Sequence, residues 1–577
     1  MRSARATCFA LVALLLCPVT QAVSAGAPHA QAAAVKPVPT AARAAAPAVP
    51  EAKAIDAIFR NAVKPDEPGV TVIVVRKSRT LYRAAYGMAN VELGVTMKPD
   101  HVCRIGSVTK QFTSAVIMKL AEEGKLSVSD PITKFLPDYP TQGRTITVEH
   151  LLTHTSGIQS YTDMPSWRSM LRRDLTLTEL IDVFKNEPMQ FEPGARYRYN
   201  NSGYILLGAV IEKATGKKYA DVVRERIFEP LGMTDTRYDV TEEVIPRRAA
   251  GYVRTGGRLL NAQYLSMTQP YAAGSLMSTV DDLAKWDVAM SAGRVVSAQS
   301  LARMFTPYKL ASGNETGYGY GWAISQYEGR AAQEHGGGIP GFRAYVLRIP
   351  AEGVYVAVLS NLSASDPNLG LLARRSAAIA IGKPLVNPVA VPLKPEQLEA
   401  CVGRYRTLSG SRHVVTRDGT RMFVLLEGGE RKEVFPSAVD AFFEKDSFLR
   451  LRFERDSSGK AVRLTVDNWG AGPPAVRDDT PEKPAPAAAS VDPAVYRAYV
   501  GEYELAPGFI LTVTVEGDRI MTQATGQQKV EIFPSSPTEF FLKVTNAQIT
   551  FVKDASGAVT QLVLHQGGRD MPAKKIK

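Results

Sequence analysis

A chain of 577 residues is too long for a single hydrophobic core, so its length predicts several domains. Its composition, 45% hydrophobic and 22% charged, is that of folded globular protein and excludes a disordered or fibrous chain. The formal net charge is +12, but the basic residues are scattered without a dense run, so no nucleic-acid partner is expected. The excess positive charge suits a solvated surface or attraction to an anionic cell envelope.

Residues 1–25 have the pattern of a secretory signal peptide. Two arginines precede an apolar run over 8–19, and Val23 and Ala25 supply the small residues of a cleavage site. The run is too short to span a bilayer, although an uncleaved anchor remains an alternative. Residues 26–50 are rich in Ala and Pro and predict an extended tether. We therefore expect an exported protein, periplasmic or secreted, with no membrane span once the signal is removed.

From about residue 52 to 385 the chain mixes the hydrophobic periods of strands and helices. Residues 69–87 predict a β-hairpin because two apolar runs flank a polar turn. Helical patterns follow up to about residue 215. Three later elements are also predicted: strands over 317–325 and 342–361, and a helix over 368–382. Strands at both ends with helices between them predict one sheet built from both ends of this segment, with a helical region inserted.

The stretch RIGSVTKQ, residues 104–111, contains Ser107-x-x-Lys110 at the start of a predicted helix that ends near Gly124. On a helix, Lys110 would lie on the same face as Ser107, within reach of its hydroxyl. A hydroxyl is a poor nucleophile until a base takes its proton, and a buried lysine can be neutral near pH 7 and act as that base. Taken alone, the pair also fits a capping serine followed by a surface lysine.

Two later motifs supply partners for such a nucleophile. Tyr199-Asn200-Asn201 offers a tyrosine that can exchange protons in its ionised form beside a lysine, and an asparagine that can hold a substrate amide by donor and acceptor. His335 is followed by three glycines, which let backbone approach a substrate closely. The backbone N–H groups of Ser107 and Gly338 would then form an oxyanion hole, supported by the helix N-terminus.

In this order, Ser107-x-x-Lys110, Tyr199-x-Asn201 and His335-x-Gly337 resemble the three active-site elements of the serine beta-lactamase and penicillin-binding-protein superfamily. The class C-like branch is the most similar, because it uses Tyr-x-Asn, and residues 150–158 and 272–286 also resemble it. The resemblance covers roughly residues 52–385. It implies a beta-lactamase-like α/β (α+β) domain over 51–385, with an antiparallel sheet and an inserted helical subdomain.

The resemblance also implies a set of roles and no metal ion or cofactor. The catalytic residues would be Ser107, Lys110 and Tyr199; the substrate-binding residues would be Asn201, His335 and Gly337; and the oxyanion hole would use the backbone of Ser107 and Gly338. The expected partner is a small molecule or short peptide that acylates the serine. The oligomeric state is left open.

The third motif departs from the Lys-Thr-Gly of true class C beta-lactamases. A lysine's fixed charge suits the carboxylate of a beta-lactam, whereas His335 is neutral or only partly charged at pH 7. The resemblance therefore implies a D-aminopeptidase, DD-peptidase or esterase, acting on D-amino-acid-containing peptides or amides or on short esters. A class C-like beta-lactamase and a non-catalytic envelope or penicillin-binding protein remain alternatives.

Several other residues have both a structural and a functional interpretation. The structural one is favoured for the pair His150 and His154, which lacks the intervening glutamate of a zinc motif, and for Asp281 and Asp282, which open a predicted helix. It is also favoured for Trp167 and Arg168, which lie between helices that could border the cleft, with a role facing the substrate as the alternative. The glycines of GYGYG over 317–321 are expected in a strand, and Cys103 and Cys401 are expected to be buried and unpaired.

The C-terminal part contains an internal repeat at a constant shift of 98 residues. The shift places Val402, Gly403 and Tyr405 on Val500, Gly501 and Tyr503, and it carries later Phe-Pro-Ser and Phe-Phe segments onto equal ones. Each unit alternates apolar and polar residues and has room for about six to eight short strands. We predict two small antiparallel β-barrels, over 393–470 and 491–577, joined by a Pro/Ala linker over 471–490. Secreted D-aminopeptidase-like members of the superfamily have a similar architecture.

Overall fold

The computed structural model describes most of the chain from residue 50 onward. The described residues are 50–164, 166–407, 411–427, 429–470, 472–478, 489, 491–506, 509–525, 529–542, 547–566 and 569–577. The predicted signal peptide and nearly all of the predicted tether lie outside these residues. Within them, no helix combines the length and the apolar character that crossing a bilayer requires.

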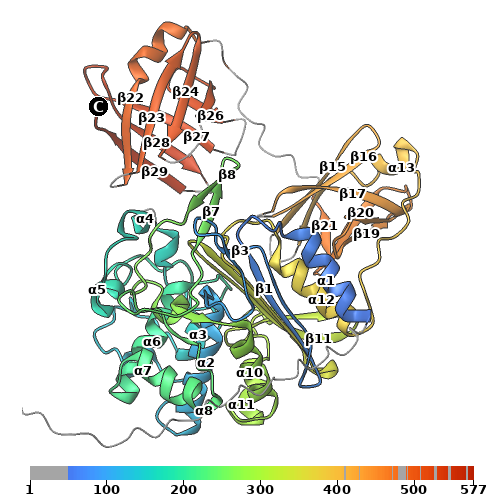
Figure 1. Cartoon of the computed structure of the whole chain (residues 1–577). Coiled ribbons are helices and arrows are strands. Elements are labelled where there is room, and N and C mark those ends of the chain that lie inside the picture. The colour runs from blue at the N-terminus through green and yellow to red at the C-terminus, as the bar shows by residue number, and fades with distance from the viewer. Residues whose placement is uncertain are drawn as a thin grey trace, which may run out of the picture. The chain divides into compact units, whose positions relative to one another are not determined.

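The N-terminal domain of the described residues is built on a six-stranded antiparallel sheet in the order β10-β11-β12-β13-β1-β2. Its strands are β1 Val70–Arg76, β2 Arg79–Tyr86, β10 Ala323–Tyr327, β11 Arg330–Ile339, β12 Phe342–Ile349 and β13 Val354–Ser360. The N-terminal hairpin β1–β2 joins the strands from the other end of the domain through the pairing of β1 with β13 (Figure 1). The prediction of a sheet assembled from both ends is therefore confirmed.

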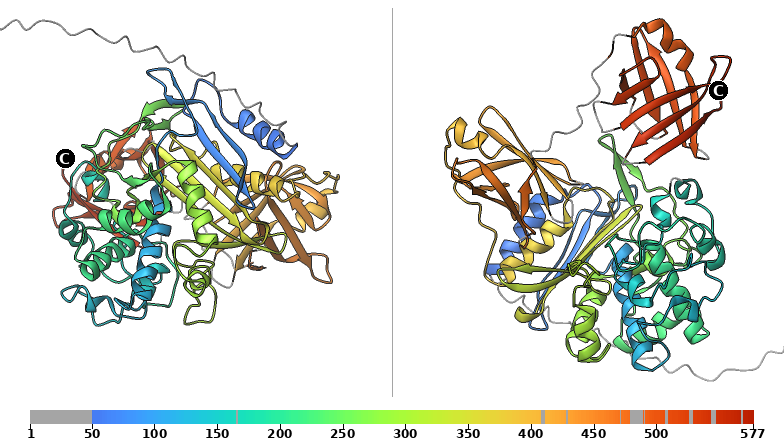
Figure 2. Two further views of the ribbon diagram at one scale, coloured as in Figure 1. Left: turned by 60° about the horizontal axis from the view of Figure 1, so that its bottom comes forward. Right: turned by 180° about the vertical axis from the view of Figure 1, so that it is seen from behind.

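Helices cover both faces of this sheet, which explains why β1 is apolar on both of its faces, with Thr71 as a buried polar exception. Val70, Val72 and Val74 belong to a core cluster that includes residues of α1 Pro50–Ala62 and α12 Leu369–Ala380. The alternate residues Ile73 and Val75 belong to a second cluster with α2 Thr109–Glu122 and α10 Val280–Ser291. A strand buried on both faces favours apolar side chains on both, in place of alternation with polar ones. Both views of Figure 2 show helices beside each face.

The inserted helical region lies between β2 and β10 in sequence. Its helices are α2, α3 Val148–Leu152, α4 Trp167–Met170, α5 Leu177–Asp182, α6 Asn201–Thr215, α7 Tyr219–Val223, α8 Glu229–Leu231, α9 Tyr271–Gly274, α10 and α11 Ala298–Met304. Its short strands are β3 Met88–Asn90, β4 Val95–Thr96, β5 Cys103–Arg104, β6 Arg237–Tyr238, β7 Tyr252–Thr255, β8 Arg258–Asn261 and β9 Leu276–Ser278. The side chain of Asn200 caps α6 at its start, and Gly216 ends it with a φ of 69°.

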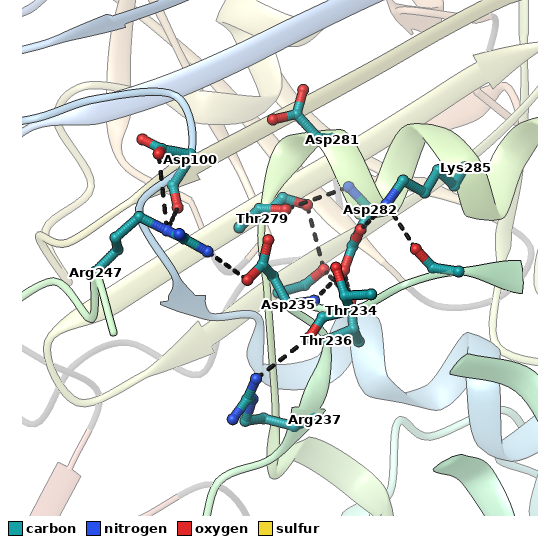
Figure 3. Close-up of polar contacts among 12 residues, drawn as sticks. Asp100, Thr234, Asp235, Thr236, Arg237, Arg247, Thr279, Asp281, Asp282 and Lys285 are labelled. Carbon is teal, nitrogen blue, oxygen red and sulfur yellow. Dashed lines mark hydrogen bonds and ion pairs between the residues drawn. The ribbon is translucent and has the colours of Figure 1, made fainter. Parts of the chain in front are cut away.

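A polar network holds the start of α10 in place (Figure 3). The Thr279 side chain caps the helix by accepting the backbone N–H of Asp282. The buried carboxylate of Asp282 accepts the backbone N–H of Asp235 at 2.8 Å and the hydroxyl of Thr236 at 2.9 Å, and it pairs with Lys285 at 2.7 Å. The prediction of acidic residues in the first turn is confirmed. Asp282 also ties the segment before β6 to α10.

The described C-terminal residues form two closed antiparallel barrels of eight strands each. The first contains β14 Gly403–Thr407, β15 Arg412–Asp418, β16 Arg421–Leu426, β17 Arg431–Ala438, β18 Ala441–Phe443, β19 Leu449–Arg455, β20 Ala461–Asn468 and β21 Ala475–Arg477, preceded by α13 Pro395–Glu399. The second contains β22 Gly501–Ala506, β23 Phe509–Glu516, β24 Arg519–Ala524, β25 Val530–Pro534, β26 Glu539–Leu542, β27 Ala547–Lys553, β28 Val559–Gln566 and β29 Arg569–Lys575. The predicted architecture of two small barrels is thus confirmed.

Equivalent strands of the two barrels carry equivalent contacts. The Tyr405 hydroxyl donates to the Cys401 carbonyl at 2.8 Å, and the Tyr503 hydroxyl donates to the Tyr499 carbonyl at the same distance. Both tyrosines are fully buried, and their positions are those related by the 98-residue shift in the sequence. Cys401 is buried as a free cysteine, and so is Cys103 of the N-terminal domain.

The linker predicted over 471–490 starts too early. Ala475–Arg477 form β21, which pairs with both β14 and β20 and completes the first barrel. Ala475 is buried there and lies opposite Thr407 and Leu464. Three residues within a Pro/Ala-rich stretch are too few to show the alternation of apolar and polar residues that marks a strand. The sequence pattern therefore did not predict this strand. Residues 479–488 and 490 of the predicted linker lie outside the described residues.

Candidate active site

Ser107 and Lys110 lie at the start of α2. Ser107 occupies a 3₁₀ turn, Gly106–Val108, that leads directly into the α-helix at Thr109. The spacing of three residues places the Lys110 Nζ 3.2 Å from the Ser107 Oγ. The predicted helix start and the predicted contact are therefore both present.

Lys110 is fully buried, and its amine has two further partners. Nζ donates to the Asn201 Oδ1 at 2.8 Å and to the Ala273 carbonyl at 2.9 Å. Burial lowers the pKa of Lys110 well below its usual value, which favours the neutral amine. A neutral amine has two N–H bonds, and the two oxygen acceptors take both. Its lone pair is then left for the hydroxyl proton of Ser107, as a general base requires.

Tyr199 lies against the same amine, with the centre of its ring 4.9 Å from Lys110 Nζ. Burial raises the pKa of Tyr199 far above its usual value, and this outweighs the opposing effect of its hydrogen bond with Ser107. A neutral lysine also supplies no positive charge to stabilise a phenolate. The expectation of an ionised tyrosine is therefore wrong, and Tyr199 presents a neutral hydroxyl beside the serine.

Asn201 makes more hydrogen bonds within the protein than the sequence suggested. Its Oδ1 accepts from Lys110, and its Nδ2 donates to the Thr162 hydroxyl at 3.0 Å. Its backbone N–H donates to the Ser160 hydroxyl at 3.1 Å. One Nδ2 hydrogen and the second lone pair of Oδ1 remain for a substrate, so the expected use of both amide ends stays a prediction.

The segment His154–Thr162 is the support on which the Tyr199–Asn201 motif lies. Besides the contacts of Ser160 and Thr162, the His154 Nδ1 accepts the backbone N–H of Asn200 at 3.0 Å. The His154 ring also lies 4.3 Å from the Tyr199 ring, centre to centre. These contacts show that the HTSGIQSYT stretch positions the Tyr199–Asn201 motif. The contribution of Thr162 was not predicted from the sequence.

The histidine pair considered for zinc has a structural use instead. The His150 Nδ1 accepts the backbone N–H of Thr147 at 3.2 Å in a capping box at the start of α3. His154 is occupied by the contact with Asn200. Among the described residues, no group of three His, Cys, Asp or Glu side chains is placed to hold a metal ion.

The glycines of the third motif pack directly against the 3₁₀ turn that contains Ser107. A Cβ at Gly337 would lie 2.0 Å from the Ile105 carbonyl oxygen, and one at Gly106 would lie 2.9 Å from the Gly338 nitrogen. A Cβ at Gly338, by contrast, would meet nothing within 4 Å. Close backbone contact therefore explains the glycine at 337, which was expected to bind substrate. The nitrogen of Gly338 lies near Gly106 of this turn, and its part in an oxyanion hole stays a prediction.

His335 precedes these glycines on β11 and is 6% exposed. Its Nε2 lies 2.8 Å from the Tyr318 hydroxyl, and its Nδ1 lies 2.7 Å from the Gly336 carbonyl oxygen. Burial is the largest cause that lowers the pKa of His335, to about 3. The imidazole is therefore neutral near pH 7, and both of its nitrogens are already used within the protein.

Tyr318 comes from the GYGYG stretch, for which the prediction of a strand was wrong. Residues 317–322 form a loop, and β10 begins only at Ala323. Gly321 has a φ of +78°, and a Cβ there would lie 2.8 Å from the Lys110 carbonyl oxygen. The alternation of Gly and Tyr imitates the period of a strand, but the glycines are there for close packing and a left-handed backbone.

The indole N–H of Trp167 is hydrogen-bonded within the protein. Its Nε1–H donates to the Gln269 Oε1 at 3.0 Å, and its ring lies edge-on to Tyr161. These contacts fit the favoured structural interpretation of Trp167, and a role facing the substrate remains the alternative. The side chain of Arg168 lies outside the described residues.

Comparison with known families identifies the class of protein to which this fold and these buried polar groups belong. The chain belongs to the Beta-lactamase family, whose model matches residues 55–381, more than half of the chain. A second model, a domain of unknown function (DUF3471), matches residues 485–575.

Similar proteins include one relative that matches nearly the whole chain. "Penicillin-binding protein 4*" of Bacillus subtilis is 25% identical over 544 residues, covering 91% of this chain and 99% of the relative. "Putative penicillin-binding protein PbpX" of the same organism is 30% identical over 272 residues, covering 47% of this chain and 65% of the relative. Among solved structures, the "octameric penicillin-binding protein homologue from Pyrococcus abyssi" is 28% identical with a TM-score of 0.51, covering 74% of this chain and 99% of that one.

Proposed function

We propose that this chain is an exported serine hydrolase that forms an acyl-enzyme on Ser107 and cleaves amide or ester bonds of small substrates. The observation that carries the proposal is the fully buried amine of Lys110, which lies 3.2 Å from the Ser107 hydroxyl and also contacts Asn201 Oδ1 and the Ala273 carbonyl; burial lowers its pKa well below the usual value. A structural lysine on a helix surface would be exposed and charged. Burial removes this amine from water, which costs free energy. Such a cost is expected at a site where a neutral amine serves as a base.

The proposed acylation step uses each group once. The Ser107 Oγ attacks the substrate carbonyl while its proton passes to the Lys110 Nζ. The carbonyl oxygen gains negative charge, which the backbone N–H groups of Ser107 and Gly338 stabilise. The Tyr199 hydroxyl gives its proton to the leaving nitrogen or oxygen and recovers one from the Lys110 ammonium. Water then attacks the acyl group, loses a proton to the same pair, and releases Ser107.

The substrate class follows from the charges around the nucleophile. The third motif supplies no cation, because His335 is buried and neutral with both nitrogens bonded. Amides or peptides containing D-amino acids, or short esters, need no such cation, so we propose them as substrates. A class C-like beta-lactamase is less well supported, because a beta-lactam carboxylate would find no fixed positive charge at this position.

The name of the nearly full-length relative favours a second candidate, a protein that binds penicillin without turning it over. Such a protein would form the acyl-enzyme and fail to hydrolyse it, or would bind without acylation. Export is proposed from residues 1–25 alone, with the N-terminal sequence of the purified protein as its test.

Covalent labelling tests the assignment of the nucleophile and its base. A fluorescent phosphonate is expected to label the wild type, and Ser107→Ala is expected to lose labelling while keeping the fold. Lys110→Ala should slow labelling by several orders of magnitude, because base and nucleophile work as a unit. Undiminished labelling of Ser107→Ala would refute the assignment, and a loss below about tenfold for Lys110→Ala would count against it as the base.

A panel of substrates separates the candidate functions. Chromogenic D- and L-amino-acid anilides, short p-nitrophenyl esters and nitrocefin would be compared by kcat/KM on the wild type. Turnover of an anilide or ester above nitrocefin supports the proposal. Nitrocefin turnover equal to the best of the others supports the beta-lactamase. Stable labelling with penicillin and no turnover supports the binding protein.

A further inference from the structure

The loop that carries Tyr318 is held rigidly by backbone contacts. A Cβ at Gly319 would lie 2.1 Å from the Met304 carbonyl oxygen, and one at Gly321 would lie 2.8 Å from the Lys110 carbonyl oxygen. The loop is thus pressed against α11 on one side and α2 on the other. Tyr318 is only 3% exposed, so its hydroxyl has a fixed position beside the His335 Nε2.

The two hydrogen bonds of His335 determine where its proton lies. The partner of Nδ1 is the Gly336 carbonyl oxygen, which only accepts, so Nδ1 must carry the hydrogen. In a neutral imidazole, Nε2 then has a lone pair and accepts the hydroxyl hydrogen of Tyr318. Each ring nitrogen has its matching partner, and neither has a hydrogen or a lone pair to offer a substrate.

The surroundings of His335 also disfavour the charged ring. The groups that face it are the amine of Lys110, the ring of His154 and the rings of Tyr199 and Tyr318. None of these is an anion. The carboxylate of Glu334, the preceding residue, is paired with Arg374 at 2.7 Å.

We propose that Tyr318 is a specificity-determining positioning residue, which holds His335 as the uncharged Nδ1–H tautomer and thereby excludes substrates that need a cation for a carboxylate beside the scissile bond. The statement about selectivity rests on the proposed function. The statement about the tautomer rests only on the two hydrogen bonds and the burial. Tyr318 acts through His335 and does not touch the reacting atoms.

The first experiment measures the tautomer directly and needs no activity. Nitrogen NMR of the full-length protein labelled with ¹⁵N-histidine distinguishes a protonated ring nitrogen from an unprotonated one, and His335→Gln assigns the signal. The wild type is expected to show Nδ1 protonated and Nε2 unprotonated, unchanged between about pH 5.5 and 8. An Nε2–H tautomer, or titration of His335 within this range, would overturn the proposal.

Tyr318→Phe removes only the hydroxyl donor. The Nε2 signal of His335 is expected to shift, and the ring is expected to take up a proton at higher pH than in the wild type, because the neutral form has lost its hydrogen bond. Tyr320→Phe is the matched control, since Tyr320 lies in the same loop but its hydroxyl accepts from Arg303 at 2.8 Å. An unchanged His335 signal in Tyr318→Phe, or an equal change in Tyr320→Phe, would contradict the role of Tyr318. Thermal unfolding confirms that both variants are folded.

The second experiment tests selectivity with two substrates that differ only in a carboxylate. A D-alanyl depsipeptide ending in a free carboxylate would be compared with its carboxamide by kcat/KM at pH 5.5 and pH 8. The ratio of the two kcat/KM values removes the effect of enzyme groups whose titration changes both reactions equally. We expect a pH-independent ratio in the wild type and, in Tyr318→Phe, a gain for the carboxylate substrate that grows toward acid pH in step with the protonated fraction of His335 measured by NMR. A flat ratio in Tyr318→Phe, with the NMR shift present, would refute the selectivity alone. Failure to hydrolyse either substrate would instead refute the proposed function.

Discussion

The carbonyl oxygen of Ala273 accepts a hydrogen bond from the Nζ of Lys110 at 2.9 Å, although 163 positions separate the two residues. A carbonyl cannot donate, so it requires an N–H bond of the amine to point toward it. Asn201 Oδ1 requires the second. The orientation of the lone pair toward Ser107 therefore depends on α9, a turn of helix outside the three motifs.

The charge of Lys110 should control the pH dependence of acylation. Because burial lowers the pKa of Lys110, we expect the acylation rate to be level above neutral pH and to fall in acid as the amine takes a proton. Asn201→Asp places a negative charge at the position of an oxygen 2.8 Å from Nζ, which should raise the pKa of Lys110. The acid limb of the rate profile should then move to higher pH by about one unit or more.

Single-turnover acylation by a p-nitrophenyl ester, measured against pH, checks this prediction. Asn368→Asp is the matched control, because Asn368 caps α12 through its Oδ1 and an aspartate can replace it there. The control should leave the profile unchanged. An acid limb in Asn201→Asp at the wild-type pH would mean that Lys110 is not the titrating base.

The neighbouring glycines 337 and 338 should respond differently to the same substitution. Gly337→Ala puts a methyl group 2.0 Å from the Ile105 carbonyl oxygen, so the strand or the nucleophile turn must move, at a cost of about 1–3 kcal/mol. Gly338→Ala meets nothing within 4 Å and should change stability by less than about 0.5 kcal/mol. Urea unfolding of both variants measures the difference, and equal stability would show that close packing does not explain the glycine at 337.

Replacing the third-motif histidine should change substrate preference. His335→Lys introduces a permanent cation where the imidazole is neutral, and a charge-assisted contact with a carboxylate is worth about 1.5 kcal/mol or more. The ratio of kcat/KM for nitrocefin to that for a p-nitrophenyl ester should rise about tenfold or more. An unchanged ratio in a folded variant would remove the argument that charge at position 335 sets specificity.

The equivalent tyrosines of the two barrels allow a paired test of domain stability. Tyr405→Phe and Tyr503→Phe each remove a buried 2.8 Å hydrogen bond to a carbonyl, at a cost of about 1–2 kcal/mol. Hydrogen exchange measured by mass spectrometry should speed up in peptides of 401–477 for the first variant and of 499–577 for the second. Each variant is the control for the other, and faster exchange in both barrels from one substitution would show that they unfold together.

The sequence predicted those parts of the site that depend on local geometry. A spacing of three residues on a helix is enough to bring Ser107 and Lys110 together, and the alternation of apolar residues is enough to predict the sheet and the barrels. Thr162, Ala273 and Tyr318 have no comparable signal, because each reaches the site through tertiary packing. The state of Tyr199 was predicted wrongly for a related reason: burial outweighs the neighbouring lysine, and burial is a property of the folded chain.

The pairing of β1 with β13 has a consequence for how the domain folds. Ser360 donates from its hydroxyl to the Gly69 carbonyl across 291 positions, and the seven residues of β1 pair with the last strand of the sheet. During synthesis, the hairpin β1–β2 leaves the ribosome long before β13, the other neighbour of β1, exists. Contacts so distant in sequence make folding slow, and the unpaired edge of an apolar strand is prone to aggregate in the meantime. A nascent chain that stops short of residue 354 therefore lacks the partner that closes the sheet, and we expect it to depend on a chaperone until translation has passed this point.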